Sequence, residues 1–190
     1  MTGSTSSYWA PVAVAFPDEA EFLAAAGTPH DPDRTLGLVR MLAGTGEMFA
    51  PALALMKAVF AEDGLDPKLR QVLMLRMAVI RNAPYEWQMN ATLARNSGLT
   101  NGEITAIAAT HAVTGLAPAY QLACRAVDEL SATNRLGDET LNMLIESFGD
   151  AVTRRIVLVI GWAHLASLFT NGCRIPMEET DKLRGRPSPV

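Results

Sequence analysis

Cysteine is scarce in this chain of 190 residues. The two cysteines, Cys124 and Cys173, lie far apart, and neither has a second cysteine or a histidine at the spacing of a zinc site. A chain of this length can bury a sizeable core without a disulfide or a structural metal. We therefore expect two reduced thiols in a cytoplasmic protein, and no metal site.

Charged residues are also few, at 19% of the chain, and neither sign dominates. The 16 lysines and arginines stand against 20 aspartates and glutamates. Proteins that bind nucleic acid rely on clustered basic side chains, so we expect no nucleic-acid partner. The glycines at 44 and 46 are not followed by the lysine of a phosphate-binding loop, and there is no Gly-x-Ser-x-Gly motif.

Long apolar runs are missing too. Residues 1–7 lack the basic and apolar regions of a signal peptide. The longest apolar run, 156–169, is shorter than the ~20 residues that a bilayer requires. We expect that run to form a buried helix, and we expect no membrane partner.

Alternating strand patterns are absent, whereas helix start and stop signals recur. Asp66-Pro67 predicts a helix start, and Thr100 with Glu103 forms a capping box. The sequence therefore predicts an all-α single domain over 1–190, with exposed tails at 1–17 and 182–190. The expected helices cover 34–43, 48–61, 67–82, 84–97, 118–130 and 151–169, with others beginning at Thr100 and at Asp138, the latter punctuated by Gly149.

The helix expected at 67–82 is apolar on nearly every side, which predicts a position in the middle of the domain. Arg76 interrupts its apolar surface, and a guanidinium there needs an acidic partner or a ligand carboxylate. Two interpretations stay open. Arg76 forms an internal salt bridge or snorkels to the edge, or it binds substrate.

Glu86 and Asn90 are four residues apart, and with Leu93 they share one face of the next expected helix. If that face packs inward, loss of water raises the pKa of the Glu86 carboxyl toward the range of a general acid or base. A glutamate near a helix start can instead complement the helix dipole from the surface. Glu86 is our candidate catalytic residue, and Asn90 a candidate for substrate binding.

His111 and His164 lie on apolar faces of two other expected helices. Each has the placement of an ordinary core histidine, but a shared catalytic pocket is conceivable. Tyr85, Trp87 and Trp162 are candidates for lining an apolar substrate pocket, although core packing explains such aromatic residues equally well.

Three motifs in this region follow one another: Tyr85-Glu86-Trp87, Leu93-Ala94-Arg95 and Gly98-Leu99-Thr100. Together they resemble the carboxymuconolactone decarboxylase family, whose other well-known branch is the alkylhydroperoxidase D type. The resemblance covers 36–178. It implies an all-helical subunit that assembles into trimers or hexamers through a central helical hairpin.

The peroxidase branch of that family has a glutamate on the first hairpin helix, then a Cys-x-x-Cys pair, then a histidine four residues later. The matching positions here are Gln71, Ala83, Glu86 and Asn90, so all four residues are replaced. A peroxidatic thiolate needs a sulfur atom, and we expect no thiol peroxidase activity. Relatives with Tyr-Glu-Trp usually keep the histidine, whereas an asparagine cannot shuttle a proton near neutral pH.

The resemblance favours a cofactor-independent lyase or isomerase that acts on a small organic acid or a polyketide-like metabolite. In this hypothesis Arg76 holds a carboxylate or enolate oxygen, and Glu86 moves a proton. Asn90, with His164 or His111, polarises the substrate carbonyl. Decarboxylation, dehydration and cyclisation fit equally well. The alternative is a family member that has lost its chemistry and serves as a ligand-binding protein or an oligomeric scaffold.

Overall fold

The computed structural model describes residues 12–61 and 65–189. Within these ranges the chain forms eight α-helices, one short 3₁₀ helix and no strand, so the all-α prediction is confirmed. The helices are α1 (Glu19–Ala26), α2 (Gly37–Ala43), η2 (Gly46–Met48), α3 (Phe49–Val59), α4 (Pro67–Ile80), α5 (Pro84–Asn96), α6 (Asn101–Ile107), α7 (Pro118–Thr133) and α8 (Asp138–Cys173).

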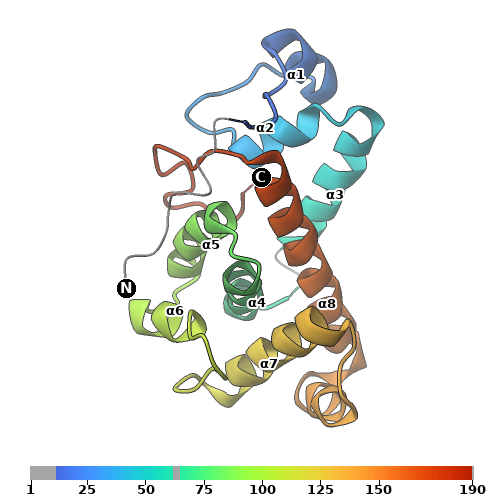
Figure 1. Ribbon diagram of the computed structural model, residues 1–190, viewed down its shortest axis with the longest axis vertical. Coiled ribbons are helices and arrows are strands. Elements are labelled where there is room, and N and C mark those ends of the chain that lie inside the picture. The colour runs from blue at the N-terminus through green and yellow to red at the C-terminus, as the bar shows by residue number, and fades with distance from the viewer. Residues whose placement is uncertain (1–11, 62–64, 190) are drawn as a thin grey trace.

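Helix α4 lies in the middle of the molecule, as its apolar sequence predicts, and α5, α7 and α8 pack around it (Figure 1). The carboxylate of Asp66 caps this helix by accepting a hydrogen bond from the Leu69 N–H at 2.8 Å, and Pro67 occupies its first turn. Ten consecutive residues of α4, Leu69 to Ala78, are buried. The central position of α4 thus follows from a sequence that is apolar all round.

A tight connection turns the chain from α4 into α5. Asn82 has φ 47°, a left-handed conformation that asparagine tolerates, and Pro84 begins the next helix. Gly98 follows the end of α5 with φ 88°, and the predicted capping box of Thr100 and Glu103 starts α6. This antiparallel pair, α4 and α5, is the central hairpin that carries the candidate site.

Helix α8 bends sharply at Gly149, where the backbone has φ 74° and ψ 164°. The bend lies where the sequence places a break between two helices. Of the described helices, α8 is the one whose length and apolar composition would permit a membrane span, and 44% of its most apolar window is buried. The core helix of a soluble protein has the same properties, so this feature is weak evidence for a membrane.

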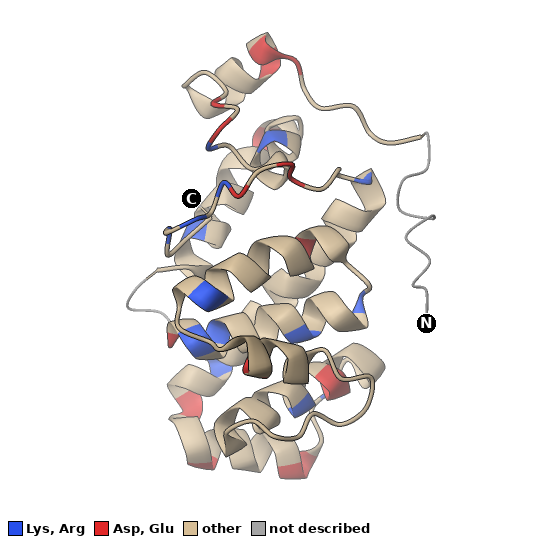
Figure 2. Ribbon diagram, turned by 90° about the vertical axis from the view of Figure 1, so that its left-hand side faces the viewer, with Lys and Arg blue, Asp and Glu red and all other residues tan. Residues whose placement is uncertain are grey.

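The C-terminal segment differs from the exposed tail that its basic and proline-rich sequence predicts. Leu183 is fully buried, and the Asn96 side chain donates hydrogen bonds to the carbonyls of Leu183 and Arg186 at 2.9 and 2.8 Å. Lys182 also donates to the Thr35 carbonyl at 2.9 Å. Residues 182–189 therefore pack across the helices, with basic positions along them (Figure 2), because buried apolar side chains and hydrogen bonds hold the segment.

The N-terminal tail expected at 1–17 lies partly outside the described residues, which begin at 12. Its described part is attached: the Val14 N–H donates to the Cys173 carbonyl at 3.1 Å, and Pro17 is buried. The structure also contains α1, a helix that the sequence analysis did not predict. Asp18 caps α1, and Phe22 is its one buried residue. So short a helix carries too little apolar periodicity to be recognised.

Candidate active site

Glu86 lies in the first turn of α5, and its side chain is only 6% exposed. Asn90, one turn later, is 4% exposed and donates hydrogen bonds to the Glu86 carbonyl at 2.9 Å and to its Oε2 at 3.2 Å. Glu86 Oε1 and Asn90 Oδ1 have no hydrogen-bond partner among the residues that the structure describes. The face that carries both side chains therefore packs inward, and one carboxyl oxygen stays available.

The two side chains border a small closed cavity of about 20 Å³, which is room for roughly one water molecule. Its other walls are mostly apolar and come from several helices and from the C-terminal segment. They are Leu36, Leu38, Met56, Phe60, Met74, Tyr85, Met89, Leu93, Trp162 and Pro189. Glu86 is the one acidic residue in this lining.

Burial raises the pKa of the Glu86 carboxyl to about 7, and the hydrogen bond from Asn90 opposes that rise. Desolvation disfavours the charged form, whereas a donor to the carboxylate favours it. At neutral pH the protonated and ionised forms are then both populated. This property distinguishes a proton donor or acceptor from a surface glutamate, and it supports the inward-facing interpretation of Glu86 over the helix-dipole one.

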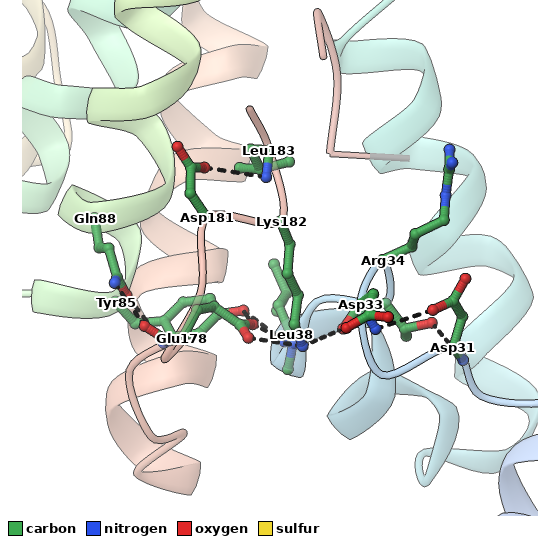
Figure 3. Close-up of polar contacts among 12 residues, drawn as sticks. Asp31, Asp33, Arg34, Leu38, Tyr85, Gln88, Glu178, Asp181, Lys182 and Leu183 are labelled. Atoms are coloured by element: carbon green, nitrogen blue, oxygen red, sulfur yellow. Dashed lines mark hydrogen bonds and ion pairs between the residues drawn. The ribbon is translucent and has the colours of Figure 1, made fainter. Parts of the chain in front are cut away.

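Tyr85 forms one wall of the cavity and is fully buried. Its hydroxyl donates to Glu178 Oε1 at 2.7 Å and accepts from the Leu38 N–H at 3.0 Å, and Figure 3 shows this arrangement. The second carboxylate oxygen of Glu178 pairs with Lys182 Nζ at 2.9 Å. Burial and the neighbouring Glu178 raise the pKa of the Tyr85 phenol, so it stays neutral. Tyr85 therefore positions α2 and residues 178–182 against α5.

The two tryptophans that the sequence analysis singles out lie in different places. Trp162 of α8 is 4% exposed and lines the Glu86 cavity, in accordance with its predicted position. Trp87 instead lines a separate open cavity of about 340 Å³, formed in part by Ala83 and Pro84. Successive residues of a helix face different directions, so Trp87 points away from its neighbour Glu86.

Arg76 is not available for the substrate-binding role. Its Nε and Nη2 donate to the two oxygens of Asp128 at 2.6 and 2.9 Å, and its Nη1 donates to the carbonyls of Ile107 and Ala109 at 3.1 and 2.6 Å. A further bond reaches the His111 carbonyl at 3.4 Å. All five N–H groups of the guanidinium are used, so the internal salt bridge is the correct interpretation.

The histidines do not join Glu86. His111 is exposed and lies in the loop after α6, because this helix ends at Ile107 and the predicted helical face does not extend so far. His164 is half-buried on α8 but lies two residues from Trp162, on a different side of the helix. Partial burial and the charge of Arg81 lower the pKa of His164. Neither histidine lines the cavity, so the structure does not bring His111 and His164 together with Glu86.

Sequence reasoning missed several walls of the cavity. Met56, Phe60 and Met74 are apolar residues of expected helices, and their sequence does not distinguish a cavity wall from ordinary core. Pro189 lines the cavity although its sequence predicts an exposed tail. Gln71, at the position of a glutamate in the peroxidase branch, is fully buried, and both polar atoms of its amide lack a partner among the described residues.

Neither cysteine lines the cavity beside Glu86. Cys124 is buried, and burial raises the pKa of its thiol to about 12. Cys173 is half-buried at the end of α8, and burial raises its thiol pKa as well. Among the described residues no three His, Cys, Asp or Glu side chains gather closely enough to hold a metal ion.

Comparison with known proteins agrees with this architecture. The model of the carboxymuconolactone decarboxylase family matches residues 46–129, which include the α4–α5 hairpin. No curated protein matches the chain.

Two solved structures resemble this fold. An AhpD-core, uncharacterized peroxidase-related protein from Ralstonia eutropha has a TM-score of 0.73 at 15% identity, covering 94% of this chain and 99% of its own. A protein of unknown function from Agrobacterium tumefaciens, named for a suggested AhpD-type role in antioxidant defence, has a TM-score of 0.64 at 20% identity, covering 70% and 92%. Residues 46–129, with Glu86 and Asn90 in their hairpin, therefore match the model of the carboxymuconolactone decarboxylase family, and the described chain has the AhpD-like fold.

Proposed function

We propose that this protein is a cofactor-independent lyase or isomerase in which Glu86 transfers a proton. The observation that carries the proposal is the Glu86 carboxyl itself, which is buried beside a mostly apolar cavity with a pKa of about 7 and an unpaired Oε1. A general acid or base is most effective when its pKa lies near the working pH. The substrate class is a small organic acid or a polyketide-like metabolite.

Asn90 holds the carboxyl in place for this role. Its amide N–H groups bond the Glu86 carbonyl and Oε2, which leaves Oε1 as the oxygen that exchanges the proton. Ionised Glu86 would remove a proton from a carbon next to a carbonyl group and return it elsewhere in an isomerisation. In a decarboxylation, CO₂ leaves its bonding electrons on an enolate, and protonated Glu86 supplies the proton to that carbon.

Thiol peroxidase activity is not favoured. Its chemistry needs a reactive thiolate, and a buried thiol with a pKa of about 12, as in Cys124, stays protonated at neutral pH. The positions of the redox pair hold Ala83 and Glu86.

One observation supports the alternative of a catalytically inactive ligand-binding or scaffold protein. The cavity beside Glu86 has room for about one water molecule, so side chains fill most of the hairpin interior. The burial and raised pKa of Glu86 favour the enzyme, because a scaffold gains nothing from a desolvated acid.

The setting that we propose is cytoplasmic and oligomeric. Both cysteines are free, which fits a reducing compartment. Helix α8 exposes Leu158, Leu165 and Leu168, each 48 to 58% exposed. These residues are three or seven positions apart and form an apolar stripe that a second copy of the chain would cover.

Glu86→Gln tests the proposal, with the exposed Glu146→Gln as its control. Small β-keto acids, lactones and ketones would be incubated with the enzyme in D₂O, and NMR would follow CO₂ release and deuterium incorporation next to the carbonyl. We expect a reaction that falls about tenfold to a thousandfold in Glu86→Gln and is unchanged in Glu146→Gln. Full turnover in Glu86→Gln would contradict the role of Glu86.

A further inference from the structure

Helix α4 carries a second buried charged side chain, Arg70. Its side chain is 2% exposed, and its Nε and Nη1 have no hydrogen-bond partner among the described residues. The guanidinium carbon lies 4.9 Å from the centre of the Phe60 ring, a cation–π contact that satisfies neither N–H group. Burial lowers the pKa of Arg70, whereas the charge of Asp66 raises it.

Asp66 does not neutralise this charge. It is exposed, and one of its carboxylate oxygens accepts a hydrogen bond from the Leu69 N–H as the cap of α4. Its charge raises the pKa of Arg70, but burial has the larger effect and lowers it. An arginine buried without an acid costs free energy. Arg76, six residues further along α4, is by contrast a structural arginine, because all of its donors are used.

Arg70 lines a cavity of about 610 Å³, within the usual size range of small-molecule sites. The described residues around it include a second cation, the exposed Lys57, and no acid. They are Lys57, Phe60, Ala61, Pro67, Arg70, Asn96, Ser97, Pro187 and Ser188. The charge of this lining favours an anion.

The Arg70 cavity adjoins the Glu86 cavity. Phe60 lines both, and the C-terminal segment contributes Pro187 and Ser188 to the Arg70 cavity and Pro189 to the Glu86 cavity. A molecule with an anionic end at Arg70 would therefore extend its body past Phe60 toward the Glu86 carboxyl.

We propose that Arg70 binds the carboxylate of the substrate in the larger cavity and that the substrate is an organic acid with an apolar body. This inference rests on the proposed function, since it says which residue binds the end of the substrate that Glu86 does not contact. Arginine binds carboxylates through two parallel hydrogen bonds, and the buried N–H groups of Arg70 are unpaired. Arg70 thus takes the role that the sequence analysis gave to Arg76.

The test measures binding, so it does not depend on turnover. Isothermal titration calorimetry would compare 4-phenylbutanoate with its uncharged analogue 4-phenylbutanamide on the wild type, Arg70→Gln, Arg70→Lys and the exposed control Arg154→Gln. We expect the carboxylate to bind the wild type and Arg154→Gln equally. Its affinity should fall at least tenfold in Arg70→Gln and less in Arg70→Lys, while the amide shows no such dependence.

Thermal unfolding of Arg70→Gln separates a binding role from a structural one. Because the native arginine is buried without an acid, we expect a melting temperature that is unchanged or higher. A clearly lower melting temperature would overturn the proposal, as would equal carboxylate binding by wild type and Arg70→Gln. Tighter binding of inorganic phosphate than of 4-phenylbutanoate would overturn the assignment to a carboxylate.

Glu86→Gln distinguishes this inference from the proposed function. It should still bind 4-phenylbutanoate, because Arg70 is intact. If turnover depends on Glu86 but no variant distinguishes the carboxylate from the amide, the Arg70 site is wrong and the proton-transfer role stands. If carboxylate binding depends on Arg70 but Glu86→Gln keeps full turnover, the Arg70 site stands and the proton-transfer role of Glu86 is wrong.

Discussion

At the scale of residues, the proposed function depends on the environment of the Glu86 carboxyl. Its carboxyl has lost water and gained one side-chain donor, Asn90, and the loss of water has the larger effect on its pKa. Asn90 supplies hydrogen bonds without adding a second titrating group. One residue therefore carries the proton, and the other fixes its geometry.

The raised pKa of Glu86 predicts that stability depends on pH. Between about pH 4.5 and 7 the folded protein keeps a proton on Glu86 that the unfolded chain has released, so stability falls as pH rises through this range. The free energy of unfolding should drop by about 3 kcal/mol more in the wild type than in Glu86→Gln between pH 5 and 8. Urea titrations at both pH values measure this, and parallel pH dependences would contradict it.

At the scale of elements, the sequence predicted the α4–α5 hairpin well because its signals are local. Asp66, Pro67, Pro84 and the capping box at Thr100 act through neighbouring backbone groups, and each is found at a helix boundary. The sequence leaves open whether Glu86 faces inward or lies on the surface, because the answer depends on which helices cover α5.

Partners from distant parts of the chain could not be predicted. Asp128 lies 52 positions from Arg76, and nothing local indicates that they meet. Pro189 and Leu183 have the sequence of tail residues because their neighbours are basic or proline, yet both side chains are buried and contact distant parts of the chain. His111 does not lie on the expected helix face, because the helix before it ends early, at Ile107.

The Arg76–Asp128 pair joins α4 to α7, and its loss should weaken the fold rather than the chemistry. Arg76 is 5% exposed and Asp128 32%, so Asp128→Asn leaves a mostly buried cation with less compensation. We expect a loss of about 2 kcal/mol in unfolding free energy, with turnover of the folded protein preserved. Chemical denaturation measures it, with the exposed Asp138→Asn as control. Unchanged stability combined with lost turnover would restore Arg76 as a substrate-binding residue.

At the scale of the whole molecule, the described structure combines the α4–α5 hairpin with segments that precede and follow it in the sequence and pack against it. Helix α2, the end of α3 and residues 178–189 border α5, and the contacts of Tyr85 with Leu38 and Glu178, together with the Glu178–Lys182 ion pair, join α2 and residues 178–182 to α5 (Figure 3). The small closed cavity and the larger cavity beside it both border residues 187–189.

The most direct test of the account is the titration of the Glu86 carboxyl in the intact protein. Carbon-13 NMR of protein labelled at the glutamate side-chain carboxyl, with Glu86→Gln identifying the resonance, would follow its protonation from pH 4 to 9. The account predicts a midpoint of about 7. A midpoint near the ordinary glutamate value of about 4.3 would show a solvated carboxylate and contradict a proton-transfer role for Glu86.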